Sequence, residues 1–157
     1  MKAASIKELK LELSTRSQKE LTELCMRLSK YKKENKELLT YLLFEESDEA
    51  AYIKNVKSEI KDEFKLINTA SYFYIKKTVR KILRNVKKYI KYSKKKETEV
   101  ELLMYFCTEF KSTVPYIEKN ITLDNIYRRQ IENIKKAISF LHEDLQYDYN
   151  QELKVLL

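Results

Sequence analysis

The residues best suited to chemistry are the cations between Phe64 and Lys96. This stretch holds twelve Lys and Arg residues and no Asp or Glu, while the whole chain has 32 basic and 24 acidic residues and a net charge of +8. Long flexible cations neutralise phosphates and release their counterions, which gives an affinity that depends on salt rather than on sequence. The charge distribution therefore predicts a surface for an anionic partner, with the backbone of RNA or DNA as the first choice.

These cations share one side of a helix that we expect over residues 72–92. At about 100° per residue, its apolar residues fall in an arc of roughly 120° and its basic residues in an opposite arc of roughly 140°. Like charges four residues apart, such as Arg80 and Arg84, repel each other, so helix stability alone does not favour this pattern. The candidate anion-binding residues are Lys77, Arg80, Lys81, Arg84, Lys88, Lys91, Lys94 and Lys95.

Two tyrosines, Tyr74 and Tyr92, lie at the edge of the basic arc, where their rings could stack on unpaired bases. Partial packing is the alternative, and it is the more common outcome for tyrosine in a helical protein. Three alternatives stay open for the cations. Carboxylates of neighbouring helices, including Glu45 and Glu46, could neutralise them, or water could simply solvate them. A helix lying on anionic lipid is the least favoured alternative, because the apolar arc is needed against neighbouring helices.

Residues that could support catalysis or bind a metal are sparse. His142 is the one histidine, and a zinc motif of the HExxH type would require a second histidine where Gln146 stands. A metal site from His142, Asp144 and Asp148 is a weaker interpretation than a solvated or core-edge histidine. The acidic stretch 45–49 could hold a divalent cation, although its last residues also suit the first turn of a helix. We expect no enzyme, no cofactor and no bound metal.

The composition predicts the fold class. The chain contains no glycine and one proline, against usual frequencies of about 7% and about 5%. Hairpin-rich β folds, glycine-rich phosphate loops and dinucleotide-binding fingerprints are therefore excluded, because all of them need glycine at tight turns. Hydrophobic residues make up 43% of the chain, which is enough for a packed core. The sequence predicts one all-α domain over residues 1–157.

We expect about seven helices in antiparallel pairs. A short solenoid-like stack, similar to HEAT or armadillo repeats, is slightly preferred over a helical bundle. Helix starts are marked by Ser or Thr residues in capping patterns, at Ser5, Ser17, Ser47, Thr98 and Thr122. A break is expected at residues 68–71, and Pro115 is expected in the next break, at a first helical turn. The last long helix should run from Thr122 to Leu145, and the tail 147–157 should be a short docked helix or a frayed end.

Cysteine usage and the lack of long apolar segments favour a cytoplasmic protein. Cys25 and Cys107 lie among apolar residues at helical spacing, so both are expected to be small buried side chains. They form no CxxC motif, and no apolar signal region follows Met1, which is typical of a reducing compartment. The longest apolar run, residues 102–107, is too short to cross a membrane.

A different class of function is a protein-interaction scaffold or a homo-oligomerising helical domain with no role in nucleic-acid binding. That alternative predicts an exposed apolar patch of several hundred Å².

Three segments carry a resemblance: KENKELLTYLLF at residues 33–44, YIKYSK at 89–94 and LHEDLQY at 141–147. They resemble a group of small, uncharacterised helical bacterial proteins. No activity is attached to that group, so the resemblance implies a bacterial cytoplasmic protein and transfers no function and no site residues.

Overall fold

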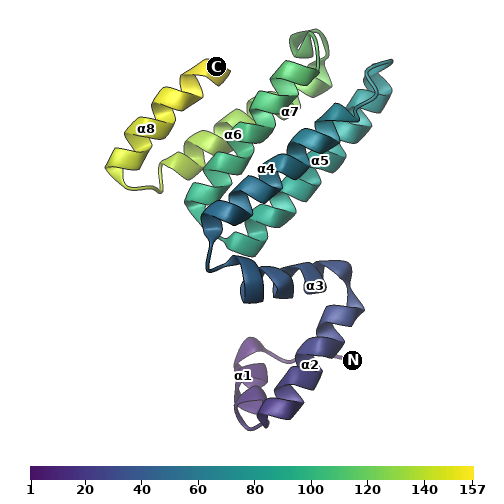
Figure 1. The fold of residues 1–157 in the computed structure, drawn as a ribbon, viewed down its shortest axis with the longest axis vertical. Helices are drawn as coiled ribbons and strands as arrows, with labels where there is room; N and C mark the ends of the chain where they lie inside the picture. Colours follow the sequence, from purple (N-terminus) through teal and green to yellow (C-terminus); the bar gives the residue numbers. More distant parts are fainter. The chain divides into compact units, whose positions relative to one another are not determined.

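The computed structural model describes all residues from Met1 to Leu157 and contains helices and no strands (Figure 1), which confirms the all-α prediction. No helix is both long enough and apolar enough to cross a membrane. Short 3-10 turns follow α6 and α8, and a π-helical turn at Tyr41–Glu45 follows α3. The eight α-helices are α1 (Ile6–Ser14), α2 (Gln18–Tyr31), α3 (Lys33–Thr40), α4 (Glu49–Lys65), α5 (Tyr72–Ser93), α6 (Lys96–Thr113), α7 (Ile121–Ile138) and α8 (Glu143–Leu153).

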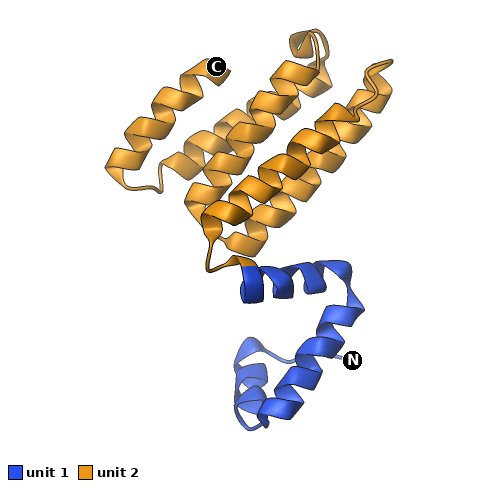
Figure 2. Cartoon of the chain, in the orientation of Figure 1, with its two compact units in different colours: residues 1–44 blue, residues 45–157 orange.

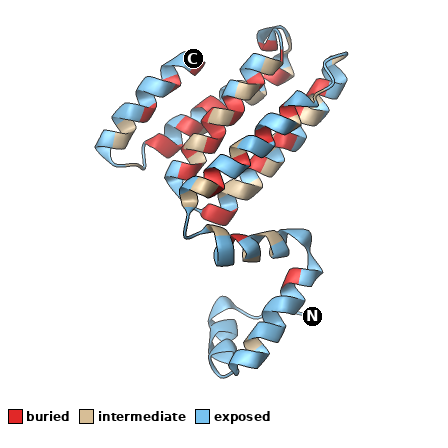
Figure 3. Cartoon of the chain, in the orientation of Figure 1, coloured by how far each residue is buried: buried red, intermediate tan, exposed pale blue.

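The chain forms two compact units, residues 1–44 and residues 45–157 (Figure 2), and the single all-α domain over residues 1–157 stays a prediction. The reason for the division lies in the uneven burial of apolar side chains (Figure 3). In the first unit only Ser29 and Tyr41 are buried, whereas α4 to α7 of the second unit each bury several apolar residues.

The first unit consists of α1, α2 and α3. The helix α1 has nine residues, and none of them is buried. Its start is fixed by the predicted capping box, in which the Ser5 hydroxyl accepts a hydrogen bond from the amide of Glu8 and the Glu8 carboxylate accepts one from the amide of Ser5 at 2.7 Å. The Ser5 hydroxyl and, to a smaller extent, the Ser5 amide donate hydrogen bonds to the Glu8 carboxylate and lower its pKa. An isolated helix this short is marginal in water, so α1 depends on such local contacts.

The second unit is a bundle around α6. The helices α4, α5 and α7 all pack against α6, and α8 packs against α7. Three fully buried rings join two of these helices: Phe64 of α4 lies 5.6 Å from Phe106 and 6.3 Å from Phe110 of α6, between ring centroids. A solenoid would stack α5 against α7 as closely as α4 against α6. The helices α5 and α7 do not pack extensively against each other, so the structure favours the bundle over the solenoid-like stack that the sequence slightly preferred.

Local capping patterns predict some helix starts correctly. Ser5 and Ser17 cap α1 and α2 as expected, and the break at 68–71 precedes α5. Asp48 caps α4 in place of Ser47 by accepting a hydrogen bond from the amide of Ala51 at 3.1 Å. Asn120 caps α7 in place of Thr122, because its side-chain oxygen accepts from the amides of Thr122 and Leu123.

The predicted cap at Thr98 is wrong. The helix α6 already begins at Lys96, and the buried Thr98 hydroxyl donates a hydrogen bond of 2.7 Å to Glu49 of α4. A tertiary contact has therefore replaced the local one. Pro115 lies outside any helix, between the end of α6 and a 3-10 turn at Ile117–Lys119.

The predicted helix from Thr122 to Leu145 is two helices. The helix α7 ends at Ile138, and α8 begins at Glu143 with His142 as its N-cap. The tail is thus a docked helix, which buries Tyr149 and Leu153.

Candidate functional site

The helix α5 separates apolar from basic residues as its sequence predicts. Ile75, Val79, Ile82 and Val86 are buried against the bundle. The cap is local, since the Ser71 hydroxyl accepts a hydrogen bond from the amide of Tyr74 at 3.5 Å. With this side fixed inward, the cations must lie on the other side of the helix.

Most of the predicted anion-binding residues are exposed and form no ion pair with a carboxylate. We define these residues as the α5 basic face: Lys77, Arg80, Lys81, Arg84, Lys91 and Lys94. Neutralisation by neighbouring helices is therefore excluded for these six side chains in the structure.

Two predicted residues differ from the others. The Nζ of Lys95 lies 3.3 Å from a carboxylate oxygen of Glu49, so its charge is largely compensated within the fold. Lys88 is partly buried, and its Nζ lies over the ring of Tyr89 at 5.1 Å from the centroid. We therefore leave Lys88 and Lys95 out of the α5 basic face.

Acidic residues of α4 approach α5 but contact uncharged groups there. Glu59 accepts a hydrogen bond from the Tyr89 hydroxyl at 2.9 Å, and Glu63 accepts one from the Asn85 side chain at 3.3 Å. Glu45 and Glu46, which we considered as partners for the cations, form no ion pair. These four carboxylates thus leave the α5 basic face uncompensated.

The aromatic residues near the basic arc differ from expectation. Tyr92 is only 9% exposed, so its ring is packed, as the alternative interpretation expected, and is not available for stacking on bases. Tyr74 is 49% exposed, and its ring lies edge-on to Phe73, with centroids 5.4 Å apart and an interplanar angle of 79°. Phe73 is 67% exposed and was missed from the sequence. The missed signal was its position in the middle of the basic arc, three and four residues before Lys76 and Lys77.

His142 is exposed at the start of α8. Its Nδ1 accepts a hydrogen bond from the amide of Asp144 at 3.4 Å and lies 3.7 Å from the Asp144 carboxylate. His142 is therefore solvated, as expected from the interpretation that we preferred over a metal site. No group of three or more His, Cys, Asp or Glu side chains is arranged to hold a metal ion.

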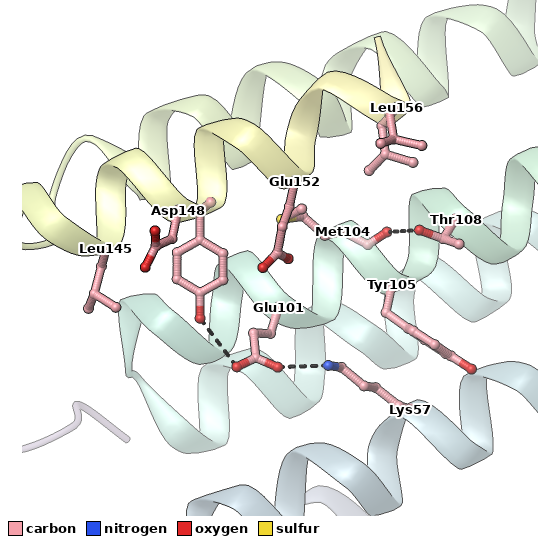
Figure 4. A pocket seen from close by; sticks show the side chains of 11 residues that line it. Lys57, Glu101, Met104, Tyr105, Thr108, Leu145, Asp148, Glu152 and Leu156 are labelled. Atoms are coloured by element: carbon pink, nitrogen blue, oxygen red, sulfur yellow. Dashed lines mark hydrogen bonds and ion pairs between the residues drawn. The ribbon is translucent and has the colours of Figure 1, made fainter.

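A cavity of about 470 Å³ lies beside α4, α6 and α8 (Figure 4). Its polar centre is Glu101, which accepts hydrogen bonds from the Nζ of Lys57 at 2.7 Å and from the Tyr149 hydroxyl at 3.2 Å. Burial, followed by the charges of Glu101 and Glu97, raises the pKa of Tyr149. The phenol therefore stays protonated and donates, and the cluster links α4, α6 and α8. These groups satisfy one another, which indicates a structural role.

Six of the eight predicted cations are thus exposed without an ion pair, while Glu101, Lys57 and Tyr149 in the cavity pair with one another. Comparison of the chain with models of known families, with curated proteins and with solved structures found no match. The resemblance to small helical bacterial proteins therefore stays a prediction.

Proposed function

We propose that this chain is a non-enzymatic binding module that presents the α5 basic face to the phosphate backbone of RNA or DNA. The observation that carries the proposal is the exposure of five cations on α5 and of Lys94 at its C-cap, with no carboxylate to compensate them. Two free cysteines are consistent with work in the reducing cytoplasm.

The spacing of the cations suits an extended polyanion. From Lys77 to Lys91 the helix advances about 21 Å, at about 1.5 Å per residue. A backbone lying along α5 could therefore contact several cations at once. Each phosphate contact releases counterions, so the affinity grows with the number of contacts and falls as salt is added.

The test is a salt titration of binding with a labelled oligonucleotide. If about five phosphates are neutralised, log K should fall with log salt at a slope of about −4.5 for duplex DNA or about −3.5 for a single strand. The double variant Lys81→Gln/Arg84→Gln should make the slope shallower by about two phosphate contacts.

A matched control removes the same charge elsewhere. Lys54 and Lys61 are exposed residues of α4 that form no ion pair, so Lys54→Gln/Lys61→Gln should leave the slope unchanged. Equal loss of affinity in both variants would show that only net charge matters. No salt-sensitive binding of either nucleic acid at low salt would end the proposal.

A second candidate function is self-association through the first unit, and the exposure of its apolar residues favours it. Side chains at helical spacing on α1 and α2 lie in solvent: Ile6, Leu9, Leu13, Leu24 and Leu28. An amphipathic helix is stabilised by burying such a stripe against another element.

A second copy of the chain suits this stripe by charge. Beside it, the first half of α2 carries Glu20 and Glu23, and the second half carries Arg27 and Lys30. Two copies of α2 lying antiparallel would bring opposite charges together, as two-fold symmetry allows. Sedimentation of the purified chain tests this. A dimer that Leu24→Glu/Leu28→Glu converts to a folded monomer would support it, and a monomer at every concentration would overturn it.

A further inference from the structure

We propose that the α5 basic face takes single-stranded nucleic acid in preference to duplex, and that Phe73 and Tyr74 form a stacking platform for bases at its N-terminal end. This inference rests on the proposed function and adds the class of nucleic acid. It is carried by the exposed pair of aromatic rings beside the cations.

The side chain of Phe73 is exposed and is not part of the buried core. The buried side of α5 is supplied by Ile75, Val79, Ile82 and Val86, and the ring of Phe73 contacts only the neighbouring ring of Tyr74 among the aromatic side chains. A phenyl ring left in water forfeits the favourable free energy that burial in the core would give. Stability of the bundle therefore does not explain an aromatic residue at this position.

The platform is held on a rigid element. Tyr74 donates its amide hydrogen to the Ser71 hydroxyl, which fixes the first turn of α5. The edge-on contact between the two rings restrains both side chains and covers one face of only one of the two rings. A preformed aromatic surface loses little conformational entropy on binding.

The platform and the cations lie on the same side of the helix. Lys77 and Arg80 follow Phe73 by four and seven residues, which is the spacing of neighbours along one helix face. A strand whose phosphates contact these cations would place its bases within reach of the rings. Bases of a single strand have free faces, whereas bases in a duplex already stack on each other. The rings therefore add affinity for the single strand alone.

The experiment measures anisotropy of three labelled ligands: a single-stranded oligonucleotide, its duplex, and a backbone of equal length that lacks bases. The wild-type chain should bind the single strand most tightly. The variant Phe73→Ala/Tyr74→Ala should weaken single-strand binding about fivefold or more, since one stacked base contributes about 1–3 kcal/mol. Its binding of the duplex and of the abasic backbone should stay unchanged.

The matched control is Tyr147→Ala, because Tyr147 is an equally exposed ring on α8. It should bind all three ligands as the wild type does, and circular dichroism should show that both variants keep their helices. Equal affinity for the single strand and the abasic backbone would overturn this inference and leave the proposed function standing. Failure of all three ligands to bind at low salt would overturn both this inference and the proposed function.

Discussion

The carboxylate of Glu49 accepts a hydrogen bond from the hydroxyl of Ser93, which ties the first turn of α4 to the last turn of α5. The same carboxylate accepts from Thr98 at 2.7 Å and lies 3.3 Å from the Nζ of Lys95. One acidic side chain thus joins three helices. It also explains why Lys95 differs from the exposed cations of α5.

We predict that Glu49→Gln destabilises the second unit by about 1.5–3 kcal/mol, because hydrogen bonds to a charged group are the stronger kind. Urea unfolding followed by circular dichroism measures this. The control is Glu46→Gln, an exposed residue without an ion pair, which should change stability by less than about 0.5 kcal/mol. Equal stability of the two variants would contradict the role given to Glu49.

The two thiols should differ in reactivity. Cys107 is fully buried and Cys25 is exposed, so the prediction that both are buried is wrong for Cys25. Burial raises the pKa of the Cys107 thiol to about 12, which keeps it in the less reactive protonated form. A thiol reagent should modify one cysteine in the native chain and two in denaturant. Fast labelling of native Cys25→Ser would contradict this.

Stability should fall at alkaline pH, in part through Tyr127. Its hydroxyl donates to the carbonyl of Leu156 at 2.7 Å, and burial raises its pKa from 10.0 to about 12. A raised pKa in the folded state stabilises fully below the unfolded value, and this stabilisation is lost as pH rises from about 10 to about 12. The fall in the urea midpoint between the two ends of this pH window should therefore be smaller for Tyr127→Phe than for the wild type. An identical alkaline fall in both would contradict the assignment.

The lack of glycine has a local cost at Lys94. This residue follows the last residue of α5 as its C-cap, with φ 60° and ψ 4°, in the left-handed region that glycine adopts without strain. A residue with a side chain is strained there by about 1–2 kcal/mol, and glycine would remove this strain. Part of the gain is offset, because glycine also gives the unfolded chain more conformational entropy. Lys94→Gly should therefore raise stability by up to about 1 kcal/mol. The same change inside α5, Lys87→Gly, should lower it by about 1 kcal/mol, and thermal unfolding of both variants checks the contrast.

Features that depend on neighbours in the sequence could be predicted. The capping box of Ser5 and Glu8 and the cap at Ser17 involve residues three apart, so their spacing is sufficient. The two sides of α5 follow from helical periodicity alone, which placed Ile82 inside and Arg84 outside. The absence of glycine predicted the all-α class for the same reason, since it restricts the local conformations of the backbone.

Features that depend on contacts between distant residues needed the tertiary structure. Tyr74 and Tyr92 lie at the same edge of the α5 wheel, yet one is exposed and the other buried, because the packing around a helix changes along its length. Thr98 looked like a cap and instead binds Glu49, 49 residues away in the chain. Residues of α5 alone therefore determined which cations share a side, and only the positions of carboxylates on other helices decided which of those cations stay uncompensated.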